Sequence, residues 1–123
     1  MTGKKGVFLQ KKQAMNWIEL TQQQQLEELT ALSKSEPVLI FKHSTRCIIS
    51  KMALRNFESE FDSDGKIIPY FLDLIAHRDL SNAIADHFNI EHQSPQLLLI
   101  KNAEVVFHES HEGIDASVLK EYI

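Results

Sequence analysis

Cys47, the one cysteine in this 123-residue chain, is the side chain best suited to covalent chemistry. It comes shortly after the apolar run Val38–Phe41, and apolar residues recur at helical spacing after it. A cysteine at the start of a helix lies beside free backbone N–H groups and the positive end of the helix dipole, and both favour the thiolate. This position therefore predicts a reactive thiol, whereas a cysteine in the middle of an apolar helix face would only fill space.

The residues around Cys47 suit a mechanism with a single thiol. Arg46 adds a positive charge beside it, and Ser44 and Thr45 supply N-cap chemistry for the helix. Ser50, three residues later, lies on the same face of the first helical turn. A second cysteine there would resolve a mixed disulfide internally, but with serine an outside thiol must remove the attached group. Ser50 is interpreted as a solvated helix residue or as a hydroxyl that hydrogen-bonds the thiolate.

Two further positions are candidates for the same site. His43, four residues before the cysteine, either touches the thiolate or makes a structural hydrogen bond at a strand end, which is the more common role. Ser94 and Pro95 come just before another apolar run. Tight functional turns often use a cis X–Pro bond, but an ordinary trans proline at the start of a strand fits this sequence equally well.

Other kinds of site are not predicted. The six histidines are scattered, and no two of them have the i, i+4 spacing that lets one helix face hold a metal ion. They are therefore expected at the surface, with no metal site. A hydrolase with a Cys–His pair would need a third group to orient the base, and an oxyanion hole, and the sequence indicates neither.

The elements that must position these residues alternate along the chain. Strands are predicted at residues 17–20, 38–41, 69–74, 97–100 and 105–107, and helices are predicted to start near residues 21, 47, 79 and 115. Such alternation gives parallel pairing with right-handed crossovers, and the late hairpin adds antiparallel strands. The fold class is therefore α/β, a thioredoxin-like three-layer fold with a central mixed sheet of four to five strands flanked by helices. Residues 1–15 are interpreted as a flexible arm and 16–123 as one domain.

Helix caps and inward faces follow from the same patterns. Thr21 and Gln24 are expected to form a capping box, and Asp79 or Ser81 to cap the third helix. Asp115 is expected to introduce the last helix. The predicted inward side chains are Leu26, Leu29, Leu32, then Ile49, Met52, Ala53, Phe57, Phe61, and finally Val118, Leu119, Tyr122 and Ile123.

The composition of the chain excludes some classes of partner. Thirteen basic and seventeen acidic residues give a net charge of −4, and the basic ones are scattered, so nucleic acid is not expected as a partner. No apolar run approaches the ~20 residues that span a bilayer, so no membrane association is expected. A single cysteine and the lack of a signal-peptide pattern favour the cytoplasm.

Two sequence blocks are similar to those of the YtxJ-type monothiol bacilliredoxins, a family with the thioredoxin-like fold. They are Lys42-His43-Ser44-Thr45-Arg46-Cys47-Ile48-Ile49-Ser50 and, before an apolar strand, His92-Gln93-Ser94-Pro95-Gln96. The resemblance extends from about Trp17 to the C-terminus. It implies that Cys47 is the redox cysteine, that Pro95 is a cis-proline facing it, and that Ser94 presents its backbone to a bound partner.

Two positions distinguish the chain from its relatives. The family usually has proline directly after the cysteine, where this chain has Ile48. Thioredoxins carry a buried carboxylate six positions before the cysteine, where this chain has Phe41. The lack of that internal base is consistent with a one-cysteine mechanism.

The resemblance implies a cytosolic monothiol–disulfide exchange protein that removes bacillithiol, or a similar small thiol, from S-thiolated proteins through Cys47. The small thiol would be a co-substrate and no cofactor would be bound. Two alternatives stay open: a thioredoxin-fold protein-binding module without catalysis, and a glutaredoxin-like, glutathione-dependent protein. The Cys-Gly-Phe-Ser motif and Gly-Gly pair of monothiol glutaredoxins are absent. The sequence leaves the oligomeric state open.

Overall fold

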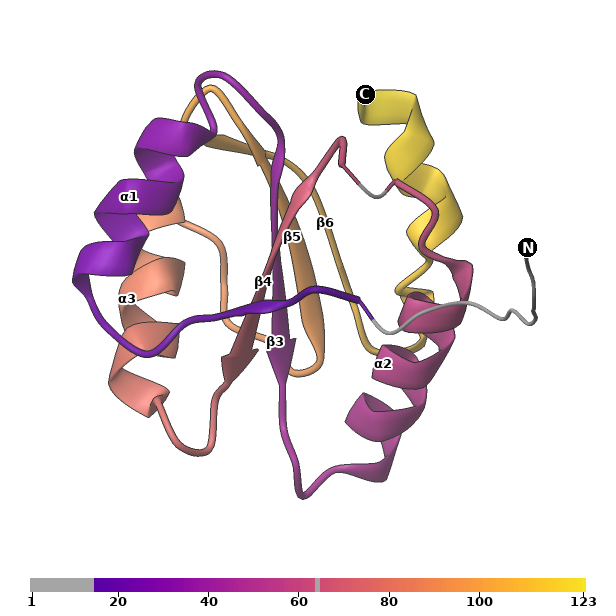
Figure 1. Cartoon of the computed structure of the whole chain (residues 1–123). Coiled ribbons are helices and arrows are strands. Elements are labelled where there is room, and N and C mark those ends of the chain that lie inside the picture. Colours follow the sequence, from indigo (N-terminus) through magenta and orange to yellow (C-terminus); the bar gives the residue numbers. More distant parts are fainter. Residues whose placement is uncertain (1–14, 64) are drawn as a thin grey trace, which may run out of the picture.

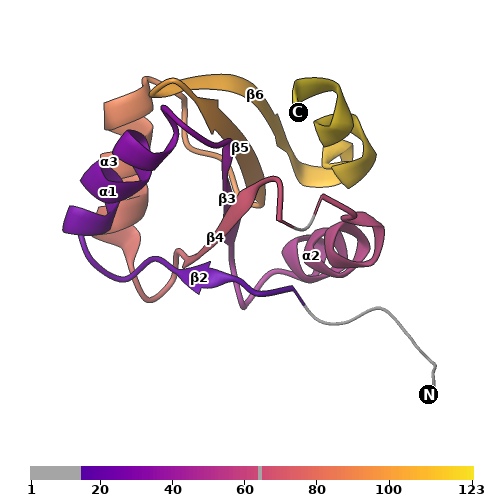
Figure 2. The same cartoon turned by 45° about the horizontal axis from the view of Figure 1, so that its top comes forward.

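The computed structural model of the chain describes residues 15–63 and 65–123. These residues form one mixed β-sheet with helices on both faces (Figures 1 and 2). Most of the predicted arm, residues 1–15, lies outside the described residues. Met15, its last residue, is partly buried against the core.

All the predicted strands and helices are present, in the predicted order. The strands are β2 (Ile18–Glu19), β3 (Val38–His43), β4 (Ile68–Asp73), β5 (Gln96–Lys101) and β6 (Glu104–Ser110). The helices are α1 (Gln24–Leu32), α2 (Ile48–Glu60) and α3 (Arg78–Phe88), followed by the 3₁₀ helices η1 (His111–Gly113) and η2 (Ala116–Tyr122). The last predicted helix is therefore of the 3₁₀ type. Asp115 caps η2 as predicted, because its carboxylate accepts the N–H of Ser117 at 2.9 Å.

The sheet has the strand order β2-β4-β3-β5-β6, so β3 is central. β3 runs parallel to β4 and antiparallel to β5, while β5 and β6 form the predicted hairpin. Asn102 and Ala103 in its turn both have positive φ, at 55° and 67°, which two-residue hairpin turns require. The three-layer α/β architecture expected from the sequence is confirmed.

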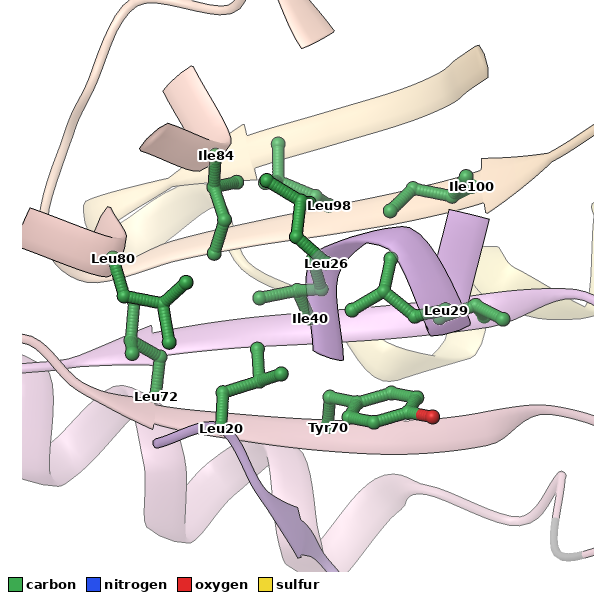
Figure 3. Packing of buried hydrophobic residues seen from close by; sticks show 11 residues of the cluster. Leu20, Leu26, Leu29, Ile40, Tyr70, Leu72, Leu80, Ile84, Leu98 and Ile100 are labelled. Atoms are coloured by element: carbon green, nitrogen blue, oxygen red, sulfur yellow. The ribbon is translucent and has the colours of Figure 1, made fainter. Parts of the chain in front are cut away.

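Every residue of β3 is buried, and successive side chains point to opposite faces of the sheet. Val38 and Ile40 belong to the cluster beneath α1 and α3, which we call the α1/α3 face (Figure 3). Leu39 and Phe41 belong to the cluster beneath α2 and η2, which we call the α2/η2 face. Two separate cores thus hold the central strand, and its carboxyl end is fixed from both sides.

Several helix starts differ from the prediction. α1 begins at Gln24, and the amide that reaches back is that of Gln25, whose Oε1 accepts the N–H of Thr21 at 2.7 Å. The predicted capping box is therefore wrong. α3 follows His77, so neither predicted residue is its N-cap: Asp79 lies in its first turn and Ser81 is buried within it. Short polar residues gather near helix starts, but only the backbone path decides which of them caps.

Some predicted inward residues are exposed. Leu32 is 37% exposed, because the helical stripe through Leu26 and Leu29 continues at Ser33, which is buried. Ile123 at the chain end is also exposed. In α2, Phe57 and the following Phe61 are buried as predicted, whereas the first turns of the helix expose their apolar side chains. Figure 1 shows these first turns beyond the end of β3, where the sheet no longer covers them.

Candidate active site at the start of α2

Cys47 is the N-cap residue of α2. Its backbone is extended, with φ −111° and ψ 122°, and its carbonyl accepts the first helical N–H, from Lys51, at 3.0 Å. Its own N–H donates to the carbonyl of Ser44 at 3.2 Å, and its side chain is partly exposed. The cysteine thus lies where the helix presents N–H groups that have no intrahelical partner. The expected cap by Ser44 or Thr45 is wrong, because no side chain caps α2.

The hydroxyl of Ser50 joins the two segments that flank Cys47. Ser50 is fully buried, and its Oγ accepts the N–H of Ser44 at 3.0 Å and lies 2.7 Å from Nδ1 of His43. Burial lowers the pKa of His43, although the neighbouring Asp73 carboxylate opposes this effect. The Ser50 hydroxyl and Nδ1 of His43 share one hydrogen bond, and the tautomer of the imidazole sets which of the two atoms donates. Ser44 and His43 are therefore the hydrogen-bond partners of this hydroxyl in the described part of the chain.

Thr45 and Arg46 occupy the turn between β3 and α2, and both are exposed. The turn places the positive charge of Arg46 at the surface, in the residue directly before the cysteine. The thiolate-supporting roles expected for Thr45, Arg46, His43 and Ser50 stay predictions.

Pro95 lies at the same edge of the sheet as Cys47. Lys42, near the end of β3, pairs with Gln96 at the start of β5, so the residues after β3 and before β5 leave the sheet together. The peptide bond between Ser94 and Pro95 is cis, as the resemblance implied. The Pro95 carbonyl accepts the N–H of His111 at 3.0 Å, which ties this loop to η1. The Oγ of Ser94 is buried without a hydrogen-bond partner among the described residues.

Exposed apolar side chains lie on the first turns of α2, directly after the cysteine. Ile48 is 72%, Ile49 44% and Met52 58% exposed, and we call these three residues the α2 patch. A pocket of about 130 Å³ opens beside it, between α2 and η1. Its lining residues are Ile49, Met52, Ala53, Asn56, His111, Glu112 and Ile114. Exposed apolar surface of this kind is typical of a docking surface for a partner.

Sequence reasoning missed the α2 patch and the part that η1 plays beside it. One signal was available: Ile48 and Ile49 are adjacent, and two neighbouring residues of a helix cannot both face one core. No feature of the sequence predicts that His111 lines this pocket and donates to Pro95, because both depend on the path of the chain after β6.

The described residues show neither a metal-binding cluster nor a membrane-spanning helix. In residues 15–63 and 65–123, no three His, Cys, Asp or Glu side chains are grouped so that they could hold a metal ion. No helix in the same residues has the length and hydropathy to cross a membrane.

Comparisons with known proteins agree with this geometry. The family model described as "Monothiol bacilliredoxin BrxC" matches residues 18–119. A solved structure described as a candidate oxidoreductase with a thioredoxin fold is 33% identical, with a TM-score of 0.73, covering 85% of this chain and 90% of that one.

Two thioredoxins are similar in fold. The thioredoxin of Malassezia sympodialis has a TM-score of 0.67 at 17% identity, covering 92% of this chain and 91% of its own. Thioredoxin f from spinach chloroplast has a TM-score of 0.65 at 15% identity, covering 94% of this chain and 96% of its own. The thioredoxin-like fold is therefore confirmed.

Proposed function

Because the chain belongs to the monothiol bacilliredoxin family, whose chemistry is thiol–disulfide exchange, we propose that it removes bacillithiol, or a similar small thiol, from mixed disulfides on cytosolic proteins. The observation that carries the proposal is the placement of Cys47. It is partly exposed at the N-terminus of α2, at the sheet edge that also carries the loop with Pro95. Ser50 occupies the position where a dithiol site would have its second cysteine.

The proposed reaction has two exchange steps. In the first, the Cys47 thiolate attacks the small-thiol sulfur of the mixed disulfide, a new S–S bond forms to Cys47, and the client protein leaves as a thiolate. In the second, another small thiol, as its thiolate, attacks the small-thiol sulfur of that bond. Cys47 leaves as a thiolate, and the two small thiols leave joined as a disulfide. Electrons balance because the client sulfur is reduced while the incoming small thiol is oxidised, and the transferred small-thiol sulfur stays at the disulfide level throughout.

The surrounding residues have separate parts in this proposal. Ser94 presents its backbone to the bound disulfide beside Pro95, and the positive charge of Arg46 favours an ionised sulfur. Ser50 is a positioning residue: its hydroxyl bonds Ser44 and His43 and so fixes the turn before the helix, and it does not bind the client or the small thiol. The α2 patch receives apolar side chains of the client protein around its modified cysteine.

The test uses a client protein that carries one bacillithiol, followed by mass spectrometry. Wild-type protein is expected to gain the mass of one bacillithiol as the client loses it, and Cys47→Ser abolishes the transfer. A matched control moves the only thiol along the same helix: the double variant Cys47→Ser/Ser59→Cys places it at an exposed position, where Ser59 stands now. That variant is expected to react at least about tenfold more slowly, because its thiol is no longer at the N-terminus of the helix.

A second arm identifies the small thiol. The same client is loaded with glutathione in place of bacillithiol, and the two rates are compared. Faster release of glutathione would make the protein glutaredoxin-like. Equal rates for the wild type and for the variant with the relocated thiol would contradict the proposed role of Cys47.

A binding module without catalysis is the second candidate, and the exposed α2 patch favours it. In that case the client would bind with the same affinity to the wild type and to Cys47→Ser, and no bacillithiol would be transferred. Met52→Glu is expected to weaken client binding both for a thiol-exchange protein and for a binding module. The transfer of bacillithiol mass to Cys47 is therefore the measurement that distinguishes the two functions.

A further inference from the structure

Lys42 is an unusual residue for the central strand of a sheet. Its side chain is fully buried. It points to the α1/α3 face, because every second residue of a strand points to the same side and Val38 and Ile40 point there. No carboxylate in the described part of the chain forms a salt bridge with its amine. Burying an amine without an opposite charge is costly, and an apolar side chain of similar size would avoid that cost. The contacts of the amine therefore require an explanation.

The amine connects three parts of the chain. Nζ of Lys42 donates to the backbone carbonyl of Ser81 in α3 at 3.1 Å and to Nδ1 of His92 at 3.3 Å. Oγ of Ser81 also lies 3.2 Å from the same ring nitrogen. His92 belongs to the loop that leads to Pro95, so the amine fixes this loop against both β3 and α3.

A second buried side chain holds the same loop. Gln96 of β5 is the register partner of Lys42, so both side chains lie on the same face of the sheet. Its Nε2 donates to the carbonyl of Glu91 at 3.0 Å, and its Oε1 accepts the N–H of Gln93 at 3.4 Å. Residues 91–93, just before Ser94 and Pro95, are thus held by side chains of two adjacent strands.

We propose that Lys42 and His92 are positioning residues that hold the loop bearing Ser94 and Pro95 in place for disulfide exchange at Cys47. This inference rests on the proposed function and adds residues on the face of the sheet opposite α2. Neither side chain is proposed to touch the reacting sulfur atoms. Lys42 binds His92, and through His92 it holds the loop that leads to Pro95.

The contact makes the loop sensitive to acid. Nδ1 of His92 accepts from Lys42, but a protonated imidazole can only donate and would face an ammonium group. Burial lowers the pKa of His92, and the positive charges of Lys42 and Arg78 lower it further. Asp86 and Glu91 line a surface pocket together with His92. The loop is therefore expected to be held at neutral pH and released in acid.

The test compares two substitutions at one position. His92→Asn keeps an acceptor near the position of Nδ1 but cannot be protonated, whereas His92→Leu removes the acceptor. The same substitutions at His108, which is exposed on β6, are the matched controls. Rates of mass transfer from the client are divided by the rate at which iodoacetamide alkylates Cys47, because alkylation does not need the loop.

We expect this rate ratio to fall about tenfold in His92→Leu at pH 7 and to stay within about threefold of wild type in His92→Asn. Between pH 7 and pH 5.5 the ratio falls in the wild type but not in His92→Asn. Ratios that do not differ among the wild type, His92→Leu and His92→Asn would overturn the inference.

Hydrogen exchange of the Gln93 amide separates this inference from the proposed function. After correction for the intrinsic rate, protection is expected to decrease in acid in the wild type, to be lost at both pH values in His92→Leu, and to persist in His92→Asn. If no bacillithiol is transferred but protection follows this pattern, the proposed function fails while the loop contact stands. Protection that is equal in all three proteins overturns the loop contact, whatever the transfer rate.

Discussion

Lys42 and His43 are neighbours at the end of β3, and each supports a different half of the site. His43 lies on the α2/η2 face and contacts the hydroxyl of Ser50, seven residues away in the helix that Cys47 begins. Lys42 lies on the α1/α3 face and contacts residues 39 and 50 positions away. The cysteine turn is therefore held by local contacts and the Pro95 loop by long-range ones. The two halves are joined by the backbone of this strand and also at η1, because the Pro95 carbonyl accepts the N–H of His111 and η1 lines the pocket beside α2.

The largest effect is expected from truncating Lys42. Lys42→Ala leaves a cavity and two acceptors without their donor, so the free energy of unfolding should fall by about 3–5 kcal/mol. Lys42→Met fills the same volume and avoids burying an amine, so its cost should be only about 1 kcal/mol. Urea denaturation measures both. Equal losses in the two variants would mean that the amine, and not the volume, determines stability.

Alkaline pH gives an independent measure of the same amine. Burial lowers the pKa of Lys42 from 10.5 to about 8, so between these values the unfolded chain binds more protons than the folded one. Stability should therefore rise as the pH increases from about 8 to 10.5, by up to about 3 kcal/mol at about 1.4 kcal/mol per pKa unit. Lys42→Met lacks this gain, so the difference between the two curves isolates it.

The difference between the two stability curves is needed because Tyr70 also titrates in this pH range. Burial raises the pKa of Tyr70, so its titration lowers stability above about pH 10 in both proteins. Curves for the wild type and Lys42→Met that run parallel from pH 8 to 10.5 would contradict a buried, titrating amine.

A smaller effect should distinguish Ser50 from Ser81, whose side chains are both fully buried. Ser50→Ala removes the acceptor for the Ser44 N–H and the partner of His43, so it should cost about 2 kcal/mol. Ser81→Ala leaves the carbonyl that Lys42 uses and removes only the contact between Oγ and His92, so it should cost about 1 kcal/mol or less. Thermal unfolding of the two variants measures the contrast. The reverse order would mean that the cysteine turn is not the part held by a serine hydroxyl.

The sequence predicted the parts of the molecule that depend on periodicity. The apolar runs at Val38–Phe41 and Leu97–Ile100 are strands in the core, and the residues after Cys47 form a helix. The cap of α1 could not be predicted in the same way, because Thr21, Gln24 and Gln25 are all able to bond the backbone and only the chain path selects one.

The supporting residues of the site were harder to predict than the site itself. Cys47 and Pro95 stand next to recognisable strands, so the pattern around each of them indicates its place. Lys42 ends an apolar run, where a lysine ordinarily extends its amine to solvent. Its burial depends on Ser81 and His92, which are far away in sequence, and the sequence alone predicts His92 at the surface.

Trp17 gives the protein a built-in optical probe. It is the chain's single tryptophan, and its indole N–H donates to the Glu58 carboxylate of α2 at 2.7 Å while its ring contacts Phe41, Phe57 and Phe71. Its fluorescence therefore reports whether α2 remains docked on the sheet. An attached small thiol that displaced this helix would change the emission without any added dye, so each exchange step can be timed in a stopped-flow instrument.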